Sequence, residues 1–186
     1  MFQTIEPTSD EHLAQQARSD KAAFAELYRR HVTRVYRYHL VRTGNVRDAE
    51  DLTSETFLAV LEGIRSFRGD GLFTAWLMGI ASRRRALLFR RRRPEVPIEA
   101  ALHIPTSGLS PESEASLRLQ LESVSQALRQ IKRERAEIIA LCLFAGLTCA
   151  EAAQTLKKSE AAVKMSLSRG LRDLRERTSL KLEVES

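Results

Sequence analysis

The sequence contains few of the features that mark secreted, membrane-spanning or metal-binding proteins. It has 2 cysteines in 186 residues and no apolar run of about eighteen residues, so neither a disulfide framework nor a transmembrane helix is expected. Because the 4 histidines are scattered without cysteines or carboxylates at ligand spacing, no metal site or cofactor is predicted. We expect a reduced, cytoplasmic protein that is not inserted in a membrane, with Cys142 and Cys149 acting as small buried hydrophobic residues.

Glycine, proline and aromatic residues are also scarce. The chain has 8 glycines, 5 prolines and 6% aromatic residues, while alanine, leucine, arginine and glutamate dominate. These common residues favour helices over strands, so an all-α protein is predicted. Four of the 5 prolines lie between residues 94 and 111, where no apolar periodicity is visible. This stretch is interpreted as a flexible linker that joins two small helical domains.

The linker divides the chain into five segments. They are an N-terminal extension (1–19), a first helical domain (20–93), the linker (94–111), a second helical domain (112–178) and a C-terminal tail (179–186). The extension and the tail carry no feature from which a role can be read.

Three helices are predicted in the first domain. Asp20 can cap a helix over residues 21–42 that ends at Gly44, and Asn45 can cap a second helix. A glycine-rich turn after Phe67 precedes a third. Apolar residues recur at steps of three and four, which gives each helix one buried face, and Asp48, Asp51, Glu55 and Glu62 follow another face of the second helix. The predicted buried residues are Phe24, Leu27, Tyr28, His31, Val35, Tyr38 and His39, then Ala49, Leu52, Phe57, Val60, Leu61 and Ile64, then Trp76, Leu77, Ile80, Ala81 and Leu88.

The second domain is predicted to end in a helix-turn-helix. Helices over 112–131 and 134–145 come first, and Thr148 then caps a short helix. A three-residue turn follows, and Ser159 caps a longer basic helix, the order expected of this DNA-binding motif. The exposed face of the last helix carries small and basic side chains, which suits entry into a major groove.

Basic charge is concentrated in two places. The net charge of +6 comes from a basic first half and from a basic stretch over residues 132–181, which are separated by an acidic middle. Two basic regions are expected of a protein that meets a polyanion at two sites. The densest cluster is SRRRALLFRRRR at residues 82–93, whose arginine blocks repeat every seven residues and therefore fall on the same sides of a helix.

Two stretches of the chain resemble one bacterial protein family. RDAEDLTSETFLAVLEGIRSFRGDGLFTAWLMGIASRRRALLFRRRR and, after the linker, QALRQIKRERAEIIALCLFAGLTCAEAAQTLKKSEAAVKMSLSRGLRDLRE are similar to sigma factors of the extracytoplasmic-function (ECF) group. The resemblance implies that residues 20–93 bind core RNA polymerase and recognise and melt the promoter −10 element, and that residues 112–178 read the −35 element. It also implies promoter DNA and an anti-sigma factor as partners, and no catalysis by the chain itself.

The resemblance also implies roles for individual residues. It assigns Asp48, Asp51, Ser54 and Glu55 to binding of core polymerase. It assigns Phe67, Arg68, Phe73, Trp76, Arg83, Arg84, Arg90 and Arg91 to the −10 element, and Lys164, Ser168, Arg169 and Arg172 to the −35 element.

A few positions stand out against the family pattern or the helical pattern. Lys157 occupies a turn position where the family commonly has glycine, and Arg83 and Leu87 replace the usual Asn and Asp. Arg84 lies close to the buried stripe of its helix, where an unpaired guanidinium is very costly. It must therefore extend to solvent, pair with an acid such as those of the second helix, or face a partner.

Two other classes of function are compatible with parts of the sequence. A helix-turn-helix regulator that does not join polymerase would account for the second domain, but not for the acidic helix or the glycine-rich turn. An enzyme acting on nucleic acid would need paired carboxylates, a Cys-His set, a metal cluster or a phosphate-binding glycine loop, and none is recognisable.

Overall fold

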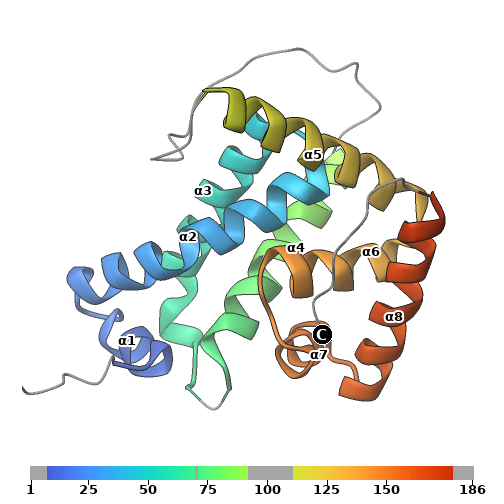
Figure 1. Cartoon of the computed structure of the whole chain (residues 1–186). Coiled ribbons are helices and arrows are strands. Elements are labelled where there is room, and N and C mark those ends of the chain that lie inside the picture. Colours follow the sequence, from blue (N-terminus) through green and yellow to red (C-terminus); the bar gives the residue numbers. More distant parts are fainter. Residues whose placement is uncertain (1–7, 70, 92–110, 178–186) are drawn as a thin grey trace, which may run out of the picture.

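The computed structural model describes residues 8–69, 71–91 and 111–177, and every regular element in these ranges is helical, which confirms the all-α prediction. The predicted tail and, except for Pro111, the predicted linker lie outside these ranges. Figure 1 shows the elements in order: α1 (Asp10–Gln16), α2 (Lys21–Thr43), α3 (Val46–Gly63), η1 (Ile64–Ser66), α4 (Phe73–Arg91), α5 (Pro111–Gln130), α6 (Arg133–Ile139), η2 (Ala140–Phe144), α7 (Cys149–Leu156) and α8 (Glu160–Arg177).

The N-terminal module consists of α1 to α4. The local signals work as expected: the Asp20 side chain accepts a hydrogen bond from the Ala22 amide, and the Asn45 side chain accepts one from the Asp48 amide. Gly44 ends α2 in the left-handed conformation (φ 67°). A Cβ at this position would lie 2.5 Å from the Ser125 hydroxyl oxygen, so both the backbone angle and the packing require glycine.

Several residues differ from the predicted burial. Tyr28 is 43% exposed and Leu61 is 49% exposed, although both were expected in the core, while Asp48 is buried in the first turn of α3 instead of lying on its exposed acidic face. Phe24, Trp76 and Leu88 are only partly buried. The periodicity of a single helix cannot distinguish a face that packs on a neighbour from an apolar face that lines an open groove, and Tyr28 borders such a groove.

The C-terminal module holds the predicted helix-turn-helix. Thr148 and Glu151 form a reciprocal capping box at the start of α7, and Lys157 ends α7 in the left-handed conformation (φ 54°). The free thiols of Cys142 and Cys149 are only half-buried, in contrast to the prediction. Burial and the neighbouring Cys149 raise the pKa of the Cys142 thiol to about 12, so this thiol is protonated and unreactive near neutral pH.

The two modules pack directly against each other. α2 contacts α5 and η2, and α4 contacts α7, so that in Figure 1 the helix-turn-helix lies beside α4 and α5 crosses the end of the N-terminal bundle. Among the described residues, no helix is both long enough and apolar enough to cross a membrane.

A buried cluster around Glu137 joins the modules; we call Tyr38, Arg42, Ser82, Arg85 and Glu137 the Glu137 cluster. Glu137 Oε1 accepts hydrogen bonds from the Tyr38 hydroxyl (2.5 Å) and the Ser82 hydroxyl (2.7 Å). Its Oε2 accepts one from Arg85 Nη2 (2.7 Å) and lies 3.4 Å from Arg42 Nε. Glu137 is 7% exposed and Arg85 is 4% exposed. The Glu137 carboxylate of α6 thus pairs with one guanidinium group from α2 and one from α4.

Of the alternatives expected for Arg84, extension to solvent agrees with its partial exposure, and the cluster shows that another arginine of α4 is buried. Arg84 is partly exposed, and Arg85, the next residue, is the buried guanidinium of α4. Its acid partner comes from the C-terminal module and not from α3. Burial, together with the adjacent Arg85, lowers the pKa of Arg42, which is the physical cost of placing two cations near one anion.

Replacing Lys157 with glycine is expected to raise the free energy of unfolding by about 1 kcal/mol, because glycine adopts the left-handed conformation without the Cβ clash that lysine suffers. Urea unfolding followed by circular dichroism measures the change. The matched control is Lys158→Gly, at a neighbouring residue without positive φ, which should bring no gain. A loss of stability in both variants would contradict the strain argument.

Candidate functional site

The outer face of α3 combines acidic and apolar side chains. Asp51 is exposed on it, and Ser54 and Glu55 are exposed one helical turn further along. Leu58 continues the same face and is 57% exposed, and Leu61 lies beside it. Leu58 and Leu61 lie next to these carboxylates, so the face joins exposed charge to exposed apolar surface. This combination is typical of a surface that receives a basic, partly apolar partner.

A groove adjoins this face. It has a volume of about 350 Å³ and runs between α2 and α3, and Ser54 lies on its border. The residues that line it are Tyr28, Val32, Thr33, Tyr36, Glu50, Thr53 and Ser54. Side chains of a partner helix can therefore insert beside α3 while its cations meet Asp51 and Glu55.

The aromatic residues around the start of α4 form one cluster. The Phe67 and Phe73 rings meet edge to face with centroids 5.6 Å apart, and Trp76 lies 5.4 Å from Phe67 and 5.9 Å from Phe73. Phe67 and Phe73 are buried and Trp76 is partly exposed. Of the three aromatic candidates, only Trp76 therefore presents an accessible surface for a base, and the other two support it from below.

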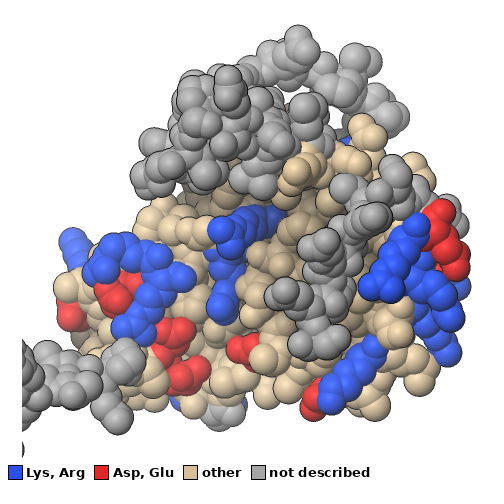
Figure 2. Space-filling model, viewed as in Figure 1, with Lys and Arg blue, Asp and Glu red and all other residues tan. Residues whose placement is uncertain are grey.

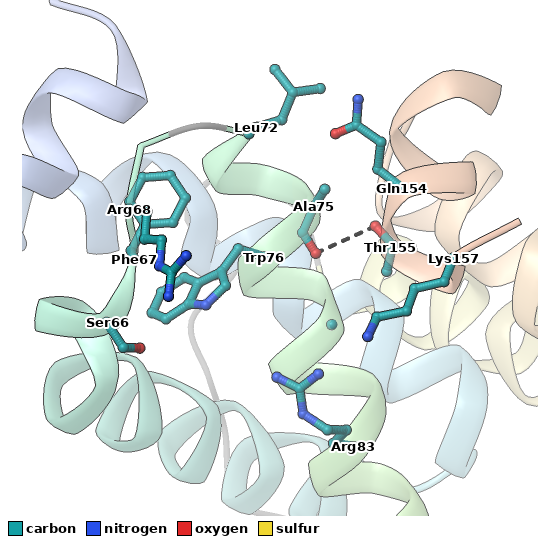
Figure 3. A pocket seen from close by; sticks show the side chains of 12 residues that line it. Ser66, Phe67, Arg68, Leu72, Ala75, Trp76, Arg83, Gln154, Thr155 and Lys157 are labelled. Atoms are coloured by element: carbon teal, nitrogen blue, oxygen red, sulfur yellow. Dashed lines mark hydrogen bonds between the residues drawn. The ribbon is translucent and has the colours of Figure 1, made fainter.

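A cavity of about 330 Å³ lies next to Trp76 (Figure 3). The N-terminal module contributes Arg68 and Arg83 to its lining, and the C-terminal module contributes Gln154 and Thr155 of α7 and Lys157, which follows α7. The Thr155 hydroxyl approaches the Ala75 carbonyl oxygen at 3.4 Å across the contact between the modules. The pocket joins an aromatic wall to the three cationic side chains of Arg68, Arg83 and Lys157, which suits an unstacked base with its phosphate, and α7 lines part of it.

The arginines of α4 point in several directions. Arg83 and Arg90 are exposed, and Arg84 is partly exposed. Arg91 is the last residue of the helix, and its side chain lies outside the described part of the structure. Arg85 is buried in the Glu137 cluster. The arginine-rich stretch therefore supplies both a basic surface and a structural ion pair.

The predicted −35 residues share one face of α8. Lys164, Ser168, Arg169 and Arg172 are all exposed, and Figure 2 shows basic side chains gathered over this helix. Lys164 pairs with Glu160 at 2.7 Å, and Arg135 of α6 pairs with Asp173 at 2.5 Å. Arg169 and Arg172 are thus available for phosphate or guanine contacts.

Some residues of these surfaces were not found from the sequence. Leu58 was not assigned to any face, and Gln154 and Thr155 of α7 become wall residues only because the modules pack together. Within the described ranges, no group of three or more His, Cys, Asp or Glu side chains is arranged to hold a metal ion.

Comparisons with known proteins identify both modules. The chain matches the model of Sigma-70 region 2 over residues 27–95 and that of Sigma-70 region 4 over residues 121–174. It is 36% identical to the ECF RNA polymerase sigma factor BldN of Streptomyces coelicolor, with 87% of this chain and 63% of BldN covered. It is 32% identical to the RNA polymerase sigma factor NccH of Alcaligenes xylosoxydans xylosoxydans, with 88% of this chain and 91% of NccH covered.

A solved structure resembles nearly the whole fold. The structure of CnrH in complex with the cytosolic domain of CnrY has a TM-score of 0.68 to this chain at 25% sequence identity, with 91% of this chain and 96% of the other covered. CnrH is a protein of Cupriavidus metallidurans. The alignment spans both modules of this chain.

Proposed function

Because the chain belongs to the ECF group of RNA polymerase sigma factors, we propose that it binds core RNA polymerase and directs it to a specific set of promoters. The observation that carries this proposal is the match to both sigma regions in one chain, with an exposed candidate surface on each. Synthesis of RNA belongs to the polymerase, and the chain acts as a specificity factor in the cytoplasm.

The outer face of α3 is the proposed contact with core polymerase. Exposed Asp51 and Glu55 attract basic side chains, Ser54 accepts or donates a hydrogen bond, and Leu58 supplies apolar area. Asp48 is buried and is assigned a supporting role in the first turn of α3. Charge at the rim accelerates association, and the apolar residues hold the complex once it has formed.

The surface around Trp76 is the proposed −10 site. A flipped base can stack on Trp76 while Arg68 and Arg83 contact the backbone phosphates. Phe67 and Phe73 hold Trp76 in place from the core, and Arg84 and Arg90 extend the basic surface along α4, while the role of Arg91 rests on the resemblance alone. Phosphate contacts of this kind give affinity that falls with salt.

The exposed face of α8 is the proposed −35 reader. Lys164, Ser168, Arg169 and Arg172 project from the second helix of a helix-turn-helix, the helix that enters the major groove in this motif.

The packed arrangement suits an inactive form under the control of an anti-sigma factor. α7 lines part of the cavity beside Trp76, so separation of the modules would widen the access of DNA to that site. CnrH, whose fold aligns over both modules, was solved with the cytosolic domain of CnrY bound. We therefore expect a regulatory protein to hold this chain in the packed arrangement and to block the surfaces needed for initiation.

Run-off transcription with purified core polymerase tests the proposed function. With the chain added, transcripts are expected to start at a restricted set of promoters that core polymerase alone does not use. Equal transcription from any AT-rich template would contradict promoter specificity. DNA binding without association with core polymerase would instead identify a regulator that works outside the polymerase.

A further inference from the structure

The short helix α1 packs against the part of the chain that leads into α4. It lies before the residues that match the region 2 model and was assigned no role from the sequence. Leu13, Ala14 and Ala17 bury its apolar side, and it contacts α2, η1 and α4. We call residues 67–69 and 71–73 the α4 lead-in, because they connect η1 to the first residue of α4; Phe67, Arg68, Gly71 and Leu72 among them line the cavity of the proposed −10 site.

Glu11 of α1 caps α4. The Phe73 amide, the first of the helix, donates a hydrogen bond to Glu11 Oε1 at 3.0 Å. The residue before it, Leu72, has no side-chain acceptor with which to cap the helix itself. A carboxylate from another helix therefore satisfies an orphan amide and complements the positive end of the α4 dipole.

Two further contacts hold the other end of the lead-in. Arg18, just after α1, donates a hydrogen bond to the Phe67 carbonyl oxygen. The side-chain amide of Gln15 lies against Gly69, and a Cβ at position 69 would come within 2.6 Å of Gln15 Nε2. The φ of +80° at Gly69 independently requires glycine. α1 and its C-terminal flank thus contact the lead-in at Phe67, at Gly69 and at Phe73.

α1 is itself anchored to α2. The buried His31 ring donates from Nε2 to Asp10 Oδ2 at 2.8 Å, and Arg30 Nη1 donates to Asp10 Oδ1 at 2.9 Å. The same His31 ring lies 5.4 Å from the Phe73 ring. α2, α1 and the lead-in therefore form one continuous set of contacts.

We propose that α1 positions the α4 lead-in for promoter opening, with Glu11 as the positioning residue. The inference rests on the proposed function, because it assumes that the surface around Trp76 receives the flipped base. A lead-in that is held at three points keeps Arg68 and the nearby Trp76 in one conformation. The base can then enter without the free-energy cost of ordering these side chains.

The test compares Glu11→Ala with Glu11→Gln in promoter opening. Opening is followed by permanganate reactivity of −10 thymines with core polymerase, on a duplex promoter and on the same promoter carrying a preformed mismatch bubble. Glu11→Ala is expected to slow opening of the duplex about tenfold, the rate equivalent of losing one helix cap. On the bubble template, which is already open, the permanganate reactivity of the variant should stay close to that of the wild type. Glu11→Gln keeps an acceptor oxygen and should restore most of the rate.

Glu134→Ala is the matched control, since Glu134 is also a first-turn glutamate but pairs only at the surface with Lys158. Hydrogen exchange of the first α4 amides, measured on the free chain, is a readout that needs no polymerase and should accelerate in Glu11→Ala alone. Equal opening rates or equal exchange in Glu11→Ala and wild type would overturn the inference. Failure of the wild type to open any promoter would overturn the proposed function instead, and the exchange experiment would still decide whether Glu11 holds the lead-in.

Discussion

Replacing Glu137 with alanine is expected to separate the two helical modules without unfolding either of them. The substitution leaves Arg42 and Arg85 buried without their shared carboxylate and removes the acceptor of the Tyr38 and Ser82 hydroxyl groups. Removing one partner of a buried ion pair costs about 3–5 kcal/mol. Separation lets water reach both guanidinium groups, so the packed arrangement and not the helices should give way.

Small-angle X-ray scattering measures this change directly. A compact chain of this length has a radius of gyration of about 16 Å, and the Glu137→Ala variant should exceed it clearly while its helical circular dichroism is retained. Because separation widens the access to the cavity beside Trp76, the variant should also bind a single-stranded −10 oligonucleotide more tightly than the wild type.

Glu134→Ala is again the control, because it removes a glutamate of the same helix whose partner, Lys158, is at the surface. Exposed pairs of this kind contribute less than about 1 kcal/mol, so its radius of gyration and unfolding midpoint should match those of the wild type. If Glu137→Ala behaves in the same way, the Glu137 cluster does not hold the modules together.

Removing the charges of Asp51 and Glu55 together is expected to abolish transcription that depends on this chain. The variant Asp51→Asn, Glu55→Gln keeps the shape of the α3 face but loses its attraction for a basic partner. Loss of two interfacial charges should weaken binding to core polymerase about 100-fold, the equivalent of about 3 kcal/mol. Run-off transcription and binding of labelled chain to immobilised core polymerase measure the effect.

Binding of the same variant to a −35 duplex should remain at the wild-type level, because α8 lies in the other module. The −35 binding measurement therefore distinguishes a variant that has lost only its contact with polymerase from one that has lost its fold. Glu134→Gln, which removes one exposed carboxylate, provides the control in that module. Wild-type transcription by the double variant would show that polymerase does not bind this face.

The helix ends were predictable because their signals are local. Asp20, Gly44, Asn45 and Thr148 act on amides or backbone angles within a few residues of themselves, and the structure places them as expected. α1 was missed although Ser9 caps it, since a helix of 7 residues gives too short a periodic pattern to be recognised and is stabilised by packing.

The candidate surfaces were predictable in part. The exposed positions of Asp51, Ser54 and Glu55 and of the α8 residues follow from helical spacing. The burial of Phe67 and Phe73 does not follow from the sequence. An aromatic residue at a glycine-rich turn can either pack in the hydrophobic core or offer a surface on which a base stacks. Only the packing of α1 and α4 around these two rings decides between the two.

The sequence by itself determined the helical class, the two modules, the helix-turn-helix and the family, because these depend on residue spacing and on motifs within short segments. Only the tertiary structure decided that Arg85, and not Arg84, is the buried cation of α4. Both residues lie near the apolar face of the helix, and the choice depends on a carboxylate 52 residues further along the chain. A charged side chain can be buried only next to a partner of opposite charge, and the position of that partner is set by the packing of the two modules.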